Sequence, residues 1–228
     1  MSKWRRRTYD GAGVTEYPPG PHLDRYGAQK VYVTSPGSDD IGRILGSMGV
    51  VYEPYGGDYD CTILFLNCGT GDEIDTEGLR AFVEAGGCVY ASDRADTLIS
   101  RAFPGLFRFG GHRGRAGKVQ AEVLDSELES VVGSTLEITF DLGSWALLDG
   151  GGETLIRAQR GSGEYAGRPL MAHAEYGRGS VFYTCFHTRA QTSEQEKRLL
   201  QLLVVKQFST TSRQSFAQTS RSLGLSLS

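Results

Sequence analysis

The sequence predicts an α/β fold, a three-layer sandwich around a mainly parallel central sheet whose later strands are partly antiparallel. Residues 61–96 carry the main signal: two short apolar runs, at 63–66 and 88–91, have the length and composition of buried strands. An amphipathic helix pattern lies between them and ends at a glycine pair. Two strands joined by one helix form a parallel crossover unit.

The chain before this unit follows the same alternation of strand and helix. Residues 31–34 form an apolar run typical of a strand, and residues 41–48 repeat apolar side chains at helical spacing. Residues 50–52 are the predicted second strand. Within the crossover unit, Asp75 is the expected N-cap of the helix.

After the crossover unit, the alternation of strand and helix gives way to short strand-like runs that follow one another with turn residues between them. A helix is expected at 95–102 and a brief one at 126–132, and a closing helix is expected at 192–205. The predicted later strands, mostly antiparallel, are residues 119–124, 136–140, 145–148, 154–158, 169–174 and 180–186.

A length of 228 residues fits one α/β domain with irregular ends. We expect an irregular N-terminal arm over residues 1–29 and a single domain over 30–207. Residues 208–228 are rich in Ser, Thr, Gln and Arg, which predicts a disordered tail.

Composition excludes several classes of partner. A net charge of −3 gives no general attraction to nucleic acid or to anionic membranes. The sequence shows neither an apolar stretch of roughly 18 residues, the length of a membrane span, nor a signal-peptide core near its start. A cytoplasmic location is the expectation.

The four cysteines lie in or beside apolar runs and show no CxxC spacing, which favours buried reduced thiols over disulfides or a zinc site. The histidines show no metal-ligand spacing either. The sequence therefore predicts no metal and no cofactor.

The predicted topology brings distant residues to one rim. The carboxyl ends of parallel strands meet at one edge of the sheet, where ligands bind in open α/β folds. Cys68 and Asp93 follow two such strands and are expected to be neighbours there.

Two motifs give the chain a family resemblance: CVYASDRAD at the turn after residue 91, and the late GRGSVFYTCFHTRAQ before the closing helix. With the order of elements, they resemble the class I glutamine amidotransferase-like superfamily, including ThuA-like relatives, over about residues 31–206. The resemblance implies a flavodoxin-like strand order.

The catalytic motifs of that family are altered in this chain. Where the family has G-x-C-x-G, this sequence reads Ala-Ser-Asp-Arg-Ala, with Asp93 at the position of the nucleophilic cysteine. Where the family has H-x-E, it reads His187-Thr188-Arg189, so the histidine is kept and the acid is replaced by a cation. The resemblance therefore implies a non-amidotransferase branch with a degenerate site, in which glutamine hydrolysis is absent.

Each candidate residue has more than one interpretation. Asp93 is a nucleophile or base paired with His187, a cap of the following helix, or a ligand contact. Cys68 is a reactive thiol at the rim or a small buried residue at a strand end. His187 is a functional or a hydrogen-bonded structural histidine.

Gly69, Thr70 and Gly71 present main-chain amides that are expected to hold an anion, and Arg94 adds a cation at the same rim. The expected partner is thus another protein or a small polar or anionic ligand. The predicted function is an interaction or small-ligand-binding component of a larger assembly. The alternative is a hydrolase of another class that uses Asp93 or Cys68 with His187, and the basic loop at 110–118 is the next candidate surface.

Overall fold

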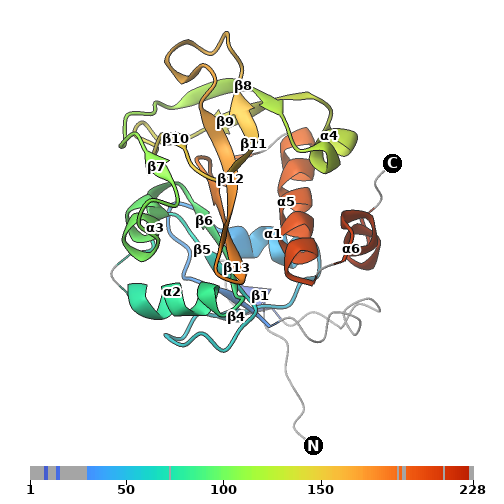
Figure 1. Cartoon of the computed structure of the whole chain (residues 1–228). Coiled ribbons are helices and arrows are strands. Elements are labelled where there is room, and N and C mark those ends of the chain that lie inside the picture. The colour runs from blue at the N-terminus through green and yellow to red at the C-terminus, as the bar shows by residue number, and fades with distance from the viewer. Residues whose placement is uncertain are drawn as a thin grey trace, which may run out of the picture.

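The computed structural model describes residues 30–71, 73–188, 190–191, 194–212 and 214–225, and the backbone of 8–9 and 14–15. Its centre is a nine-stranded sheet in the order β4-β3-β5-β6-β13-β12-β11-β8-β9, flanked by helices on both faces (Figure 1). This is the three-layer α/β architecture that the sequence predicts.

One half of the sheet is parallel. β3, β4, β5 and β6 pair in parallel, and β13 joins β6 in parallel although it comes late in the chain. Every side chain of β5 is buried, as a strand covered on both faces requires. The strands are β3 (Val31–Val33), β4 (Glu53–Pro54), β5 (Ile63–Leu66), β6 (Cys88–Ser92) and β13 (Gly179–Thr184).

The other half is antiparallel, which confirms the predicted change of character. It consists of β12 (Pro169–Tyr176), β11 (Glu153–Ala158), β8 (Gly117–Val123) and β9 (Thr135–Phe140). Two small sheets lie apart from it: β7 (Arg108–Phe109) pairs with β10 (Leu148–Gly150), and β1 (Thr8–Tyr9) pairs with β2 (Val14–Thr15).

Helices α2 and α3 lie against one face of the parallel half, and α1 and α5 lie against the other (Figure 1). Asp75 caps α2 as expected, because its carboxylate accepts hydrogen bonds from the amides of Glu77 and Gly78. The helices are α1 (Ile41–Ser47), α2 (Thr76–Glu84), α3 (Asp96–Ala102), α4 (Ser126–Val132), α5 (Glu194–Ser212) and α6 (Phe216–Ser222).

Two predicted strands differ from the structure. The second strand is Glu53–Pro54 instead of 50–52, because the ladder with β3 begins only at Glu53. Residues 145–147 form no strand, since the Trp145 ring stacks on Phe140 at 4.0 Å and this stretch hydrogen-bonds to a loop. β10 then begins at Leu148.

The prediction of a disordered tail from residue 208 is wrong for the residues that the structure describes there. Helix α5 continues to Ser212, and α6 follows with a capping box between Ser215 and Gln218. Phe208 and Phe216 are buried in the core. The prediction rested on the average composition of residues 208–228, which does not register a capping box or two separate phenylalanines. The predicted N-terminal arm lies outside the described residues except for β1 and β2.

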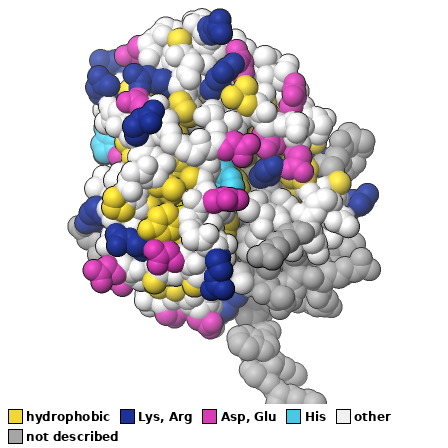
Figure 2. All heavy atoms as spheres, viewed as in Figure 1, with side chains coloured by type: hydrophobic (Ala, Val, Ile, Leu, Met, Phe, Trp, Pro, Cys, Tyr) yellow, Lys and Arg dark blue, Asp and Glu magenta, His cyan; other side chains and the backbone are white. Residues whose placement is uncertain are grey.

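Cationic and anionic side chains are interspersed on the face shown in Figure 2. Among the helices described, none combines the length and the apolar composition needed to cross a membrane.

Candidate functional site

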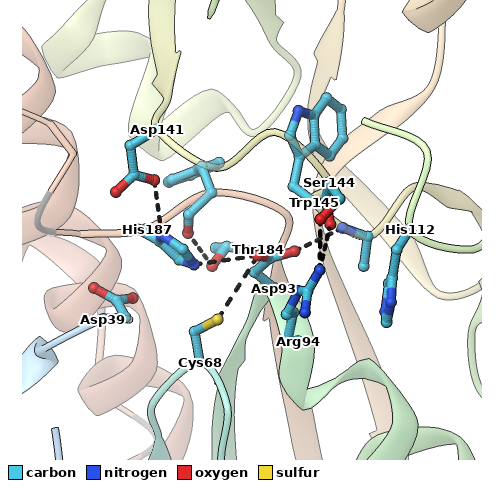
Figure 3. Close-up of polar contacts among 12 residues, drawn as sticks. Asp39, Cys68, Asp93, Arg94, His112, Asp141, Ser144, Trp145, Thr184 and His187 are labelled. Carbon is cyan, nitrogen blue, oxygen red and sulfur yellow. Dashed lines mark hydrogen bonds and ion pairs between the residues drawn. The ribbon is translucent and has the colours of Figure 1, made fainter. Parts of the chain in front are cut away.

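Four side chains from separate parts of the chain meet at the carboxyl edge of the parallel strands (Figure 3). Cys68 follows β5, Asp93 follows β6 and His187 follows β13, while Asp141 follows β9 from the antiparallel half. We call Cys68, Asp93 and His187 the elbow cluster. The predicted proximity of Cys68 and Asp93 is thus present, and His187 joins them.

Asp93 occupies a sharp turn between β6 and a short 3₁₀ helix. Its φ of 40° is positive, which is true of no other non-glycine residue that the structure describes. The Tyr183 hydroxyl donates a 2.5 Å hydrogen bond to the Asp93 carbonyl and helps to hold this backbone. A left-handed residue here costs free energy, so the surrounding contacts must maintain it.

Asp93 does not cap the next helix, which removes one of its three interpretations. The N-cap of α3 is Ala95, without a side-chain hydrogen bond. The Asp93 carboxylate points the other way: Oδ1 accepts a 2.6 Å hydrogen bond from the Ala146 amide. Its Oδ2 lies 3.7 Å from Cys68 Sγ, which donates to it, and 3.2 Å from His187 Nε2.

The elbow cluster is enclosed. Asp93 has 0% of its surface exposed, Cys68 1% and His187 2%. Cys68 is further fixed by close packing behind it, because a Cβ at Gly37 would lie 2.7 Å from the Cys68 carbonyl oxygen. Side chains in such a site keep one geometry, and any ligand must be small.

His187 is oriented by its second ring nitrogen. Nδ1 lies 2.8 Å from Asp141 Oδ1, so this nitrogen carries a proton and Nε2 faces Asp93 and Cys68. Nε2 is buried and has no hydrogen-bond partner among the described residues, although it lies at ion-pair distance from Asp93. Burial opposes the charged imidazole, but the contacts with Asp93 and Cys68 outweigh it and raise the pKa of His187 well above 6.5.

Asp141 is the functional candidate that the sequence did not reveal. The family motif places the orienting acid two residues after the histidine, at Arg189, which lies outside the described residues. The structure supplies a carboxylate from the end of β9 instead. No spacing in the sequence connects Asp141 with His187, so the motif comparison could not find it.

Residues 141–146, which we call the cover segment, close the site. Arg94, an exposed side chain, donates to the backbone and hydroxyl oxygens of Ser144, at 3.2 and 2.5 Å. The segment therefore touches the rim at three points, through Asp141, Ser144 and Ala146. The basic loop at 110–118 packs against its far end, where the Trp145 indole donates to the Arg115 carbonyl.

In the predicted anion-binding turn, Gly69–Gly71, two of the main-chain amides already donate hydrogen bonds to nearby groups of the chain. The Thr70 amide donates to the Asn67 carbonyl, and the Gly71 amide donates to the Glu73 carboxylate. Gly69 has a φ of 91°, which suits glycine. Anion binding by this turn and by Arg94 stays a prediction.

A further buried carboxylate, Asp39, lies beside the cluster (Figure 3). Its Oδ1 accepts hydrogen bonds from the amide and hydroxyl of Thr188, at 2.9 and 2.5 Å. This contact fixes the chain directly after His187.

Comparison with solved structures places this fold among known ones. A ThuA-like protein from Bacteroides uniformis ATCC 8492 has a TM-score of 0.57 at 10% identity, over 86% of this chain and 94% of that chain. A GMP synthase protein from Thermoplasma acidophilum has a TM-score of 0.55 at 11% identity, over 86% of this chain and 97% of that chain.

The same fold also occurs inside a longer chain. A β-galactosidase from Bacillus circulans sp. alkalophilus matches with a TM-score of 0.51 at 11% identity, over 86% of this chain but 31% of that chain. No protein-family model and no curated protein sequence matches the chain. The fold is thus that of ThuA-like and glutamine amidotransferase-like proteins, and likeness at this identity establishes the fold alone.

Proposed function

We propose that the chain is a non-amidotransferase member of this fold that binds a small ligand at the elbow cluster. One observation carries the proposal: Asp93, at the position of the family's nucleophile, has no exposed surface, and both of its carboxylate oxygens contact other segments of the chain. A nucleophile for glutamine needs an open path to a substrate the size of an amino acid. A buried polar cluster needs only a small partner.

The chemistry of the cluster points the same way. Hydrolysis of glutamine by this fold requires a thiolate at the elbow that attacks the amide carbon. Here the elbow carries a carboxylate, and the nearby Cys68 thiol lies in the turn after β5 and donates to Asp93. A rigid, enclosed group of donor atoms favours recognition over acyl transfer.

Association with a partner protein is the second half of the proposal. The matched fold covers 94% of the ThuA-like chain but 31% of the β-galactosidase chain, so it occurs both nearly alone and beside other domains. The occurrence of the fold in both settings supports a role for this chain as one component of an assembly.

Native mass spectrometry of the purified chain, with a glutaminase assay, tests ligand binding directly. We expect a mass above the 24.8 kDa chain that is lost in Asp93→Ala and kept in His173→Gln, a control at a half-buried histidine outside the cluster. An adduct that survives Asp93→Ala, or ammonia released from glutamine above background, would overturn the proposal.

A hydrolase that uses Asp93 and His187 is the second candidate. The positive φ of Asp93 and the Asp141–His187 contact favour it, because a strained turn and an oriented imidazole are typical of catalytic sites. Asp93 would attack an acyl carbon, expel the leaving group and form a mixed anhydride, which a water deprotonated by His187 would cleave. The cover segment must open first. Hydrolysis of p-nitrophenyl acetate that is lost in both Asp93→Asn and His187→Gln, with the fold intact, would favour this candidate.

A further inference from the structure

The elbow cluster has the dimensions of a metal centre. Cys68 Sγ, Asp93 Oδ2 and His187 Nε2 all lie within 4.8 Å of one another. Two of the three separations are 3.7 Å, from Sγ to Oδ2, and 3.2 Å, from Oδ2 to Nε2. Tetrahedral zinc with bonds of about 2.0–2.3 Å sets its ligand atoms roughly 3.3–3.8 Å apart. Small side-chain shifts would therefore complete the geometry.

The imidazole is prepared for coordination. A metal-binding histidine usually donates its other N–H to a carboxylate, which fixes the tautomer and aims the free nitrogen. His187 has this arrangement: Nδ1 contacts Asp141, and the buried Nε2 faces the cluster without a hydrogen-bond partner among the described residues. Its 3.2 Å contact with Asp93 Oδ2 has ion-pair distance without hydrogen-bond geometry, so a metal ion that takes the Nε2 lone pair would satisfy this buried nitrogen better.

Asp93 is also arranged as a single-oxygen ligand. The Ala146 amide holds Oδ1 at 2.6 Å, which leaves Oδ2 to face Cys68 and His187. In metal sites, carboxylate ligands are commonly oriented by such hydrogen bonds from groups that do not bind the metal themselves.

The set of donor atoms selects the kind of ion. One sulfur, one imidazole nitrogen and one carboxylate oxygen suit zinc and related transition metals, whereas calcium and magnesium prefer oxygen alone. Three protein ligands leave the fourth tetrahedral position to a water molecule or a small anion, as in catalytic zinc sites.

The surrounding charge favours a cation. Asp39, Asp93 and Asp141 all lie around His187 (Figure 3). Two of these carboxylates, Asp39 and Asp93, have 0% exposure. A buried carboxylate is stabilised by nearby positive charge, which a protonated His187 supplies to Asp93 from 3.2 Å when no ion is bound. A divalent ion supplies that charge and takes the place of the Cys68 thiol proton and of any proton on Nε2.

We propose that Cys68, Asp93 and His187 bind one divalent transition-metal ion, Zn²⁺ in the first instance, with Asp141 as the residue that positions His187. This inference rests on the proposed ligand-binding function and names the ligand. The ion is held at the carboxyl edge of the parallel sheet, under the cover segment.

Zinc and cobalt binding by the full chain tests the proposal. After chelator treatment and dialysis, the wild type is titrated with Zn²⁺ in competition with a chromogenic chelator, and separately with Co²⁺. We expect one equivalent of tight Zn²⁺ and a near-ultraviolet thiolate-to-cobalt absorption band. No stoichiometric Zn²⁺, or a Co²⁺ complex without the thiolate band, would overturn the proposal without any variant.

Variants locate the ion. Asp141→Asn should lower the Zn²⁺ affinity about 10–100-fold, and Cys68→Ser and His187→Gln should lower it by more. Two controls should bind as the wild type: Cys61→Ser changes a more exposed thiol, and His112→Gln breaks an imidazole–carboxylate pair with Asp96 that lacks a thiol. Circular dichroism confirms that each variant is folded.

The outcomes separate this inference from the proposed function. Zn²⁺ that remains bound in both Cys68→Ser and His187→Gln lies elsewhere and overturns the metal site. A wild type that binds no metal yet retains an organic adduct lost in Asp93→Ala keeps the proposed function and overturns the metal. A chain that binds neither overturns both.

Discussion

The Oδ2 atom of Asp93 lies 3.2 Å from Nε2 of His187, at the ends of two adjacent parallel strands, β6 and β13. The motif resemblance described above aligns these two positions with the nucleophile and the base of the glutamine amidotransferases. In this chain the pair is enclosed and shares its surroundings with a thiol and a second carboxylate.

Glutamine hydrolysis should be absent. The elbow offers a buried carboxylate instead of an accessible thiolate, so purified wild type should release ammonia from glutamine only at the background rate. A coupled glutamate dehydrogenase assay measures this. Ammonia release by the wild type that disappears in Cys68→Ala would mean that the nucleophile is Cys68, in the turn after β5, and not a residue of the elbow.

Substitutions of Asp93 should measure what the two contacts of its carboxylate contribute to stability. Asp93→Ala leaves the Ala146 amide unsatisfied and His187 without its carboxylate, which should cost about 3–5 kcal/mol of unfolding free energy. Asp93→Asn keeps an acceptor for the amide and loses the charge, so about 1.5–3 kcal/mol is expected. Urea denaturation measures both. A nearly neutral Asp93→Asn, together with a cost of only about 1 kcal/mol for Asp93→Ala, would show that the contact with His187 adds no stability.

The cover segment should loosen when its outer contact is removed. Arg94 is exposed and donates to Ser144, so Arg94→Ala should change stability by less than about 1 kcal/mol. Hydrogen exchange at the Ala146 amide, bonded to Asp93, should nevertheless become faster because the segment opens more often. Arg101→Ala, which removes another exposed arginine, in α3, is a control that should leave this amide unchanged. Equal exchange in Arg94→Ala and wild type would show that Arg94 does not hold the segment.

Acid should destabilise the chain partly through His173. Burial lowers the pKa of His173 below 6.5, and its ring stacks on Phe182 at 4.2 Å. Below pH 6.5 the unfolded state therefore binds a proton at this residue that the folded state does not, so stability falls as the pH falls. The stability difference between wild type and His173→Gln should shrink from pH 7 to pH 5 in urea titrations. A stability difference between the two proteins that stays constant from pH 7 to pH 5 would contradict the lowered pKa of His173.

The parallel half of the fold could be predicted because its strands are continuous apolar runs. Residues 63–66 and 88–91 have no polar interruption, and the glycines at 86 and 87 end the helix between them. The ends of the strands were harder to predict from the sequence. Val50 and Tyr52 are buried but do not pair with β3, and a local apolar pattern does not distinguish burial from strand pairing.

The site could be predicted in part. Strand topology brings Cys68 and Asp93 together, and the late motif singles out His187. Asp141 and Ala146 were not predictable, because they come from a loop after β9, at the far end of the sheet, that folds back over the elbow. Metal-ligand spacing was uninformative for the same reason, since the three donor atoms belong to three distant segments.

Anomalous X-ray diffraction at the zinc absorption edge, from crystals of Zn²⁺-loaded wild-type chain, locates the bound ion directly. We expect one anomalous peak within bonding distance of Cys68 Sγ, Asp93 Oδ2 and His187 Nε2, with Asp141 still in contact with Nδ1. A zinc-loaded crystal in which the direct Asp93–His187 contact persists and the anomalous signal lies only elsewhere would contradict it.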